Sequence, residues 1–450
     1  MSKEKSYKYL VIGLIILGSV LRLTVFWVSP PNNAYDDHLE VIDIYTQDFD
    51  RPAPFQCWEC YQPPLYYYTG ATVFSISKIL GASQITSWKM VQAINPLLSI
   101  LLLIIASQIL LLFKMQKIVN AIVLSFIAVL PRDIFTAAMI GNDYMLVFFS
   151  VLAFYLFLKS LNALKKGNIV WQWFIALVLA AILGSLTKQH GLLLNLFPAV
   201  IFLLLIKKVY RKMLYWAIPI ILLGVLCSLL EEIWKYNQTG HLLVSNQDYF
   251  NYADNQYPGS LKKVEFFTFR IFNLFQDPFI SQSTSASFFT ELFARTFYDY
   301  EWRFISPKTS WFYYLGFIAY SIGLIWFTFF TIVIASWVKS NKKLDLKINW
   351  HSATTKLTPI LLAFLFMIVP FLQTLRYPYF SSMKSMFMLS GIILLILTLG
   401  SLMKNKSFVK RIGAVIIAVN IIYGLVLVVS ISIYVNTSLN HLHGPLWPIP

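Results

Sequence analysis

Long apolar runs alternate with short polar segments along most of the chain. A helix needs about 20 apolar residues to cross a bilayer, and eleven runs reach or approach that length. They cover residues 9–28, 88–113, 118–131, 143–160, 170–186, 192–206, 213–230, 311–337, 357–375, 385–403 and 412–434. The runs at 118–131 and 192–206 are short, so we expect them to borrow neighbouring residues. The pattern predicts an all-α polytopic membrane protein with about eleven transmembrane helices.

Charged residues divide between alternate connections of this pattern. If the N-terminus is cytoplasmic, most of the 36 Lys and Arg residues lie in or beside short cytoplasmic loops. Of the 20 acidic residues, only Glu4 and Asp345 then lie on that side. An excess of Lys and Arg in short cytoplasmic loops is the usual orientation signal. We therefore expect a cytoplasmic N-terminus, with the first run retained as an anchor.

Two connections on the opposite, extracytoplasmic side are too long to be turns, residues 29–87 and 231–310. No linker, repeat or low-complexity tract separates a soluble domain. We therefore expect residues 1–450 to form one membrane-embedded domain whose active face is built by these two loops.

Composition supports this class of protein. Hydrophobic residues make up 58% of the chain and charged residues 12%, about half the charged share of soluble proteins. This excludes a cytosolic enzyme and a disordered chain. The net charge of +16 does not indicate a nucleic-acid partner, because the basic residues lie in short segments between apolar runs.

The first long loop opens with a cluster of ionisable residues. Asp36, Asp37, His38 and Glu40 follow the first run directly. A carboxylate near a low-dielectric boundary can have a raised pKa, which suits it to accept a proton from a hydroxyl group. The same residues also fit a solvated helix start, where acids interact favourably with the helix dipole.

Further along the same loop, Cys57 and Cys60 form a C-x-x-C pattern before a Tyr-rich segment typical of the membrane interface. On an oxidising face a disulfide is reasonable, whereas a zinc site would need a second Cys or His pair. Redox catalysis would need a thioredoxin-like context. Cys227 lies in an apolar run and fits the core.

Other ionisable residues mark the ends of later runs on the same face. They are Arg132, Asp133 and Asp143, then Lys188 and His190, and finally Arg376 and Lys384. Each alone fits a helix cap, a snorkelling side chain or an interfacial anchor. Ionisable residues at a membrane boundary are costly unless they are paired or functional. Together they indicate a site for an anionic lipid head group.

Five short motifs follow one another in this topology. They are Asp36-Asp37, Tyr61-Gln62-Pro63-Pro64-Leu65, Asn142-Asp143, Thr187-Lys188 with Gly191, and Arg376-Tyr377. The ordered set resembles the GT-C superfamily of glycosyltransferases, particularly its bacterial aminoarabinose transferase and protein O-mannosyltransferase branch. The resemblance implies a GT-C-like helix bundle with interfacial helices in the first loop. The motifs depart from the aminoarabinose transferases at Gln62, where those enzymes carry a phosphate-binding lysine.

The resemblance implies an inverting transfer of a sugar from a polyprenyl- or dolichyl-phosphate donor to a hydroxyl of a glycan, lipid or protein. We expect Asp36 and Asp37 to be the catalytic acids, with Asp36 as general base. The residues expected to bind the donor phosphate are Lys188, Arg132, Arg376, Gln62 and Tyr61, and those expected to bind sugar are Asp143, His38 and Glu40. No metal site is predicted and no cofactor is required, although a divalent cation remains open.

A transporter or flippase of lipid-linked sugars is the alternative function. It would place ionisable residues near the middle of the membrane and show inverted repeats, whereas here the charges gather at one face. A lipid-binding assembly protein is a third alternative, and it would not need the acidic pair. We expect the protein in a bacterial plasma membrane rather than in the endoplasmic reticulum.

Overall fold

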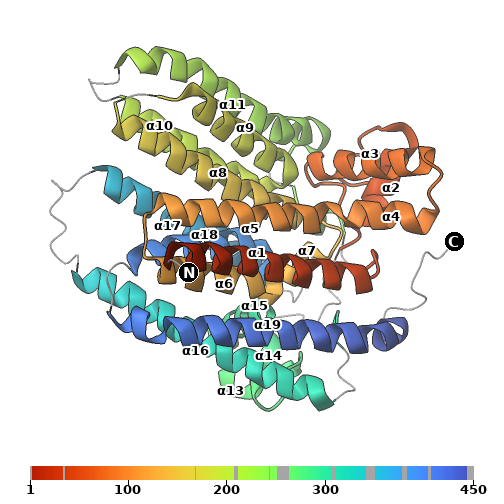
Figure 1. Ribbon diagram of the computed structural model, residues 1–450. Helices are drawn as coiled ribbons and strands as arrows, with labels where there is room; N and C mark the ends of the chain where they lie inside the picture. Colours follow the sequence, from red (N-terminus) through yellow and green to blue (C-terminus); the bar gives the residue numbers. More distant parts are fainter. Residues whose placement is uncertain are drawn as a thin grey trace.

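The computed structural model describes residues 3–33, 36–167, 169–206, 211–242, 244–250, 263–305, 310–340, 350–377, 383–403 and 407–442. These residues form helices and connecting turns, without a strand (Figure 1). The first half contains α1 (Lys3–Val28), α2 (His38–Asp48), α3 (Leu65–Ile79), α4 (Gln84–Gln92), α5 (Ile94–Leu112), α6 (Lys117–Val129), α7 (Pro131–Ala137), α8 (Asn142–Lys165), α9 (Trp171–Thr187), α10 (Leu196–Leu205) and α11 (Arg211–Thr239). The second half contains α12 (Lys263–Phe266), α13 (Ile271–Leu274), α14 (Gln282–Ser285), α15 (Phe288–Phe297), α16 (Ser310–Ser340), α17 (Trp350–Arg376), α18 (Leu389–Leu402) and α19 (Ser407–Leu442). Three 3₁₀ helices matter below: η1 (Gln189–Asn195), η3 (Asn246–Asp248) and η6 (Ser385–Met388).

The helices form an all-α polytopic bundle, as the hydrophobic pattern predicts. Within the described residues, eight helices are long and apolar enough to cross a membrane. A ninth crossing arises if the bent pair α6–α7 counts as one span. Two shorter apolar helices, Trp171–Thr187 and Gln189–Leu205, coincide with two further predicted runs. Each predicted run is therefore helical, but three of them do not form a straight helix of full length.

The bend between α6 and α7 has an identifiable cause. Pro131 begins α7 and cannot donate a backbone hydrogen bond to Ile127, so the two helices meet at 48°. The buried guanidinium of Arg22 on α1 donates instead to the carbonyls of Ile127 at 3.1 Å and Ala128 at 2.8 Å. Arg22 also forms an ion pair with Asp133, which accepts a hydrogen bond from Tyr144 at 2.8 Å. This network ties α1, α7 and α8 together at the bend.

The first long loop folds onto one end of the bundle. Its helices α2 and α3 lie beside α4 at the right of Figure 1. They pack on each other through a small apolar cluster that includes Ile42, Tyr45, Tyr66 and Tyr67. Both helices are short elements outside the candidate spans, which agrees with the interfacial position that the resemblance implies.

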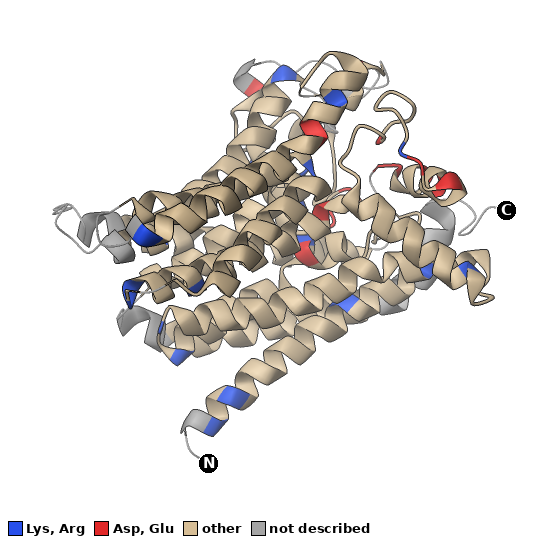
Figure 2. Cartoon of the chain, turned by 90° about the horizontal axis from the view of Figure 1, so that it is seen from above, with Lys and Arg blue, Asp and Glu red and all other residues tan. Residues whose placement is uncertain are grey.

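The second long loop begins later than expected, because α11 continues to Thr239. In Figure 1 its short helices α13 and α14 lie near the lower edge beside α16, whereas α15 lies between α6 and α19. Acidic residues of the described chain gather toward the end that carries α2 and α3, whereas the N-terminus lies toward the other end (Figure 2). The predicted cytoplasmic side of the N-terminus stays a prediction. The basic residues Lys207, Lys208, Lys342, Lys343, Lys347, Lys404 and Lys406, and Asp345, lie outside the described residues.

Candidate active site

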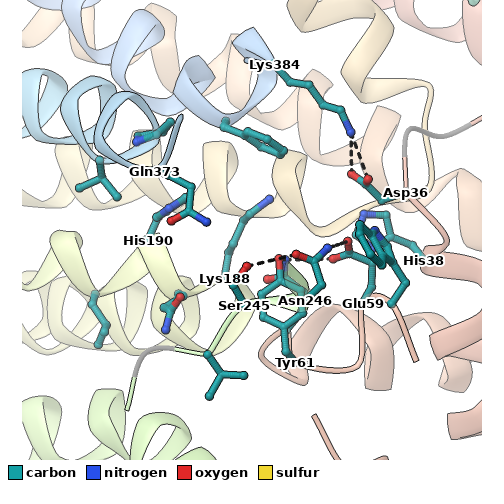
Figure 3. Close-up of a pocket in the computed structure, with 18 of the residues that line it drawn as sticks. Asp36, His38, Glu59, Tyr61, Lys188, His190, Ser245, Asn246, Gln373 and Lys384 are labelled. Atoms are coloured by element: carbon teal, nitrogen blue, oxygen red, sulfur yellow. Dashed lines mark hydrogen bonds and ion pairs between the residues drawn. The ribbon is translucent and has the colours of Figure 1, made fainter. Parts of the chain in front are cut away.

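A cavity of about 350 Å³ lies where the first loop meets α17 and the two 3₁₀ helices η1 and η6 (Figure 3). Its polar side is lined by Asp36, His38, Glu59, Tyr61, Gln62, Lys188, Gln189, His190, Ser245, Asn246, Gln373, Arg376 and Lys384. Its apolar side is lined by Trp58, Leu192, Leu193, Val244, Val369, Pro370 and Phe387. One side of the cavity is therefore polar and charged, and the other side is apolar.

Asp36 lies two residues before α2 begins and is in direct contact with Lys384 at the cavity wall. The Lys384 ammonium donates to both carboxylate oxygens of Asp36, at 3.0 and 3.2 Å. Burial alone would raise the pKa of the Asp36 carboxyl, but the charges of Lys384 and other nearby cations outweigh it, so this pKa lies below its usual value. Asp36 is therefore ionised at neutral pH and can accept a proton.

The neighbouring acids have a different position. The Asp37 carboxylate caps α2 by accepting a hydrogen bond from the Glu40 backbone at 3.2 Å. Asp37 and Glu40 are exposed, and neither lines the cavity. Partial burial of the Glu40 carboxyl group and the charge of Asp37 raise the pKa of Glu40. The structure thus separates the acidic pair into one cavity residue and one helix cap.

Lys188 is placed by a sharp change of backbone direction. Helix α9 ends at Thr187, Lys188 is extended, and η1 begins at Gln189. The chain folds back so closely that a Cβ on Gly191 would overlap the Gly184 carbonyl, which explains why glycine follows the Thr187-Lys188 motif. The turn points the buried Lys188 ammonium at Asp143 Oδ1, 2.6 Å away.

Asp143 lies in the first turn of α8 and is buried. Its second carboxylate oxygen has no hydrogen-bond partner among the described residues. Asp143 does not line the cavity itself. Asp143 therefore contacts the Lys188 ammonium from outside the cavity lining, and its predicted contact with a sugar stays a prediction.

Glu59, Tyr61 and Gln62 form a connected set on the first loop. The Gln62 amide donates to Glu59 at 3.0 Å and to the Tyr61 hydroxyl at 2.7 Å. Asn142 donates to the Gln62 carbonyl oxygen at 3.3 Å. Burial and the charge of Asp36 raise the pKa of Glu59 to about 8. Gln62, at the position where the motifs depart from the aminoarabinose transferases, thus hydrogen-bonds a carboxyl group.

His38 begins α2 and is 2% exposed. Its Nδ1 lies 2.9 Å from the Tyr67 hydroxyl. Burial lowers the pKa of His38 to about 4, so the imidazole is neutral at pH 7 and serves as a hydrogen-bonding group in the cavity wall.

The two candidate arginines lie in different environments. Arg376 ends α17, lines the cavity and keeps 65% of its side chain exposed, with Asp248 at 3.5 Å. Arg132 is 2% exposed and donates to the carbonyl of Arg295 at 2.7 Å. Arg132 does not line the cavity. It instead joins α7 to α15.

Sequence reasoning missed Glu59, and it grouped Lys384 with the head-group cations without pairing it with Asp36. Glu59 carries a signal in retrospect, because it stands three residues before Gln62 in the motif-bearing loop. Lys384 belongs to a late turn that no local pattern connects to Asp36. Among the described residues, no group of three or more His, Cys, Asp or Glu side chains could hold a metal ion.

The cysteine alternatives are resolved in the structure. Cys57 and Cys60 form a disulfide, so neither a zinc ligand pair nor a dithiol is present there. Cys227 is a free, half-buried thiol on α11.

No family model and no curated protein matches the chain. Among solved structures, the Archaeoglobus fulgidus oligosaccharyltransferase tethered with an acceptor peptide has a TM-score of 0.49 at 12% identity, over 95% of this chain and 56% of that one. The same organism's AglB with an inhibitory peptide and a dolichol-phosphate has a TM-score of 0.47 at 15% identity, over 96% and 56%. ArnT from Cupriavidus metallidurans bound to undecaprenyl phosphate has a TM-score of 0.33 at 13% identity, over 86% and 77%.

These proteins belong to the GT-C superfamily, which the sequence motifs resemble. The chain spans 56% of the length of the oligosaccharyltransferase structures.

Proposed function

We propose that this chain is an inverting glycosyltransferase that moves a sugar from a polyprenyl-phosphate donor to a hydroxyl acceptor on the extracytoplasmic face of the membrane. The observation that carries the proposal is the shared cavity. It places the Asp36 carboxylate opposite Lys384 and within the same walls as Lys188. A base and two cations in one cavity are what transfer from a lipid phosphate requires.

The apolar walls fit the lipid part of such a donor. Leu192 and Leu193 come from η1, and Val369 and Pro370 come from the candidate span Ala353–Arg376. A phosphate bound at the cation side would therefore have apolar side chains of membrane helices next to it. A soluble nucleotide sugar has no lipid chain that could pack against these apolar side chains.

The proposed reaction is a direct displacement. The acceptor oxygen forms a bond to the anomeric carbon while the bond from that carbon to the phosphate oxygen breaks, and both electrons of that bond leave with the phosphate. Asp36 takes the acceptor proton. Lys188, Lys384 and Arg376 stabilise the charge that develops on the departing phosphate, an effect strengthened where water is excluded.

Lys384 has a second consequence in this scheme. In the structure it pairs with Asp36, and this pairing lowers the pKa and hence the basicity of that carboxylate. A donor phosphate would compete for the ammonium group. Its arrival would raise the pKa of Asp36 and make it a stronger base only when the donor is present.

The test uses the purified protein in lipid nanodiscs with undecaprenyl phosphate carrying a hexose, an N-acetylhexosamine or a pentose. Total membrane glycolipids serve as acceptors. We expect release of undecaprenyl phosphate from at least one donor, and inversion of the anomeric configuration in the product. Absence of turnover, together with no binding of bare undecaprenyl phosphate by native mass spectrometry, would contradict the proposal.

A further inference from the structure

The disulfide between Cys57 and Cys60 encloses only two residues, Trp58 and Glu59, and both line the cavity. The two cysteines are 4% and 2% exposed and pack into the apolar cluster under α2 and α3. The Cys60 backbone donates to the Cys57 carbonyl at 3.2 Å. The four residues Cys57–Cys60, here called the disulfide loop, are thus anchored at both ends, so the two enclosed residues are held at the cavity wall.

The Glu59 side chain is held in a defined position. It is 3% exposed. One carboxyl oxygen accepts a hydrogen bond from Gln62 at 3.0 Å, and the other has the Asn246 amide at 3.5 Å (Figure 3). Lys188, Lys384 and Asp36 are close enough to influence its ionisation. Glu59 therefore lines the same cavity as the proposed base and the proposed phosphate cations.

The other enclosed residue supplies an apolar surface. Trp58 is half-buried, and its ring lies 5.7 Å from that of Phe250. Large aromatic rings in a cavity offer flat contact area at low cost in side-chain entropy. A sugar ring has one apolar face of C–H groups and an edge of hydroxyls, so it needs such a surface beside a hydrogen-bonding group.

We infer that the disulfide loop is the subsite for the sugar of the lipid donor, with Glu59 bound to ring hydroxyls and Trp58 packed against the ring face. This inference rests on the proposed function. It assigns substrate recognition to two residues that take no part in the displacement itself. The disulfide acts on catalysis only through their position.

The protonation state of Glu59 favours an uncharged sugar that offers hydroxyl groups to it. With its pKa raised to about 8 by burial and by Asp36, Glu59 is mostly a neutral acid at pH 7 and can both donate and accept a hydrogen bond. Sites built to hydrogen-bond a substrate hydroxyl discriminate strongly against ligands that lack it, because buried polar groups are then left unpaired.

The experiment compares binding of two probes to the full chain in nanodiscs, bare undecaprenyl phosphate and the undecaprenyl-phosphate sugar that is turned over fastest. The variants are Glu59→Ala, Glu59→Gln, Trp58→Ala and the double variant Cys57→Ser/Cys60→Ser. Matched controls are Asp48→Asn, an exposed acid on α2, and Phe55→Leu, an exposed aromatic residue of the same loop.

We expect Glu59→Ala and Trp58→Ala to weaken binding of the sugar-bearing lipid by about tenfold each, as for a lost buried hydrogen bond or aromatic contact. Binding of the bare lipid should stay within about twofold of wild type, because the phosphate cations are intact. Glu59→Gln should retain most of the preference, since the amide also donates and accepts. The double cysteine variant should lose part of the preference for the sugar-bearing lipid.

Two outcomes separate the inference from the proposed function. If wild type binds neither probe, the proposed function itself is wrong. If wild type binds both probes, but Glu59→Ala and Trp58→Ala keep its full preference for the sugar-bearing lipid, the disulfide loop is not the sugar subsite. An equal loss for both probes would also overturn it, because that pattern belongs to a phosphate ligand or a general disturbance.

Discussion

Asp36 and Lys384 lie 348 positions apart in the sequence, yet the Lys384 ammonium donates to both oxygens of the Asp36 carboxylate. The ion pair joins the first long loop to the segment just before η6. Both residues line the cavity, so a donor phosphate could compete with the Asp36 carboxylate for the Lys384 ammonium.

Replacing Asp36 by Asn should lower transfer by at least about 100-fold while donor binding survives. The amide keeps the size of the carboxylate but removes the proton acceptor, and general base assistance contributes roughly 100- to 10,000-fold. The measurement is kcat with a fixed donor, alongside the donor Kd of the same preparation.

Asp37 provides the matched control for this variant. Asn is as good a helix N-cap as Asp, so Asp37→Asn should keep both turnover and stability. Asp37→Ala should lower stability by about 1 kcal/mol through loss of the cap. Collapse of turnover in Asp37→Asn with normal turnover in Asp36→Asn would show that the base is Asp37.

Lys384→Gln should move the acid limb of the kcat/KM profile to higher pH. The pKa of Asp36 is held below its usual value mainly by Lys384, against the opposing effect of burial. Removing the ammonium group lets this pKa rise, so the base becomes protonated at a higher pH than in wild type. A profile measured from pH 4 to 8 checks this, and an unshifted acid limb would contradict the role of the ion pair.

Lys188→Ala should behave differently from Lys384→Gln. Lys188 pairs with Asp143, at 2.6 Å, and not with the proposed base. We therefore expect weaker donor binding without a comparable shift of the acid limb.

Glu59 should produce an alkaline limit in binding of the sugar-bearing lipid. Its pKa is raised to about 8, so the neutral acid predominates below that pH and the anion above it. The anion can no longer donate a hydrogen bond, and it repels the donor phosphate. We expect affinity to fall from pH 7 to 9 in wild type, and this fall to be absent in Glu59→Gln. An identical fall in both proteins would assign the limb to another group.

Gly191→Ala should destabilise the fold around Lys188. A methyl group there would overlap the Gly184 carbonyl, and overpacking of this kind costs roughly 1–3 kcal/mol. The expected result is a lower Tm and weaker donor binding. Gly13→Ala is the control, because nothing lies within 4 Å of the added Cβ at that helical position, and its Tm should not fall.

The predicted orientation can be tested independently of activity. A reporter inserted after Lys166 should be cytoplasmic, and one inserted at Gly240 should be exported. A cytoplasmic signal at Gly240 would place the cavity on the wrong face for the proposed reaction.

The bundle was predictable because each crossing must satisfy its own backbone, so apolar runs mark helices directly. The motif residues Asp36, Gln62 and Lys188 were predicted as site residues from the resemblance to the GT-C motifs, and all three line the cavity. The separate roles of these residues and their neighbours were not predictable. The sequence left open whether Asp37 belongs to the site or to a solvated helix start, and it did not show that Asp143 pairs with Lys188.

Arg132 illustrates the limit most clearly. At the end of an apolar run it resembles a cation available to a phosphate, but the fold buries it against the carbonyl of Arg295. Lys384 shows the converse. Its importance comes from the ion pair with Asp36, 348 positions away, and such a long-range pairing leaves no local pattern.

The bend at Pro131 has a consequence for how the chain enters the membrane. Arg22 lies more than 100 residues before its partners Ile127, Ala128 and Asp133, so α1 is synthesised before them. An arginine within a membrane helix costs roughly 2.5–3.5 kcal/mol on insertion scales. The nascent helix α1 must bear that cost until α6 and α7 are made. A neutral residue at position 22 would therefore insert more readily and yet assemble worse, because the finished bundle would keep an unpaired carboxylate and two carbonyls without donors.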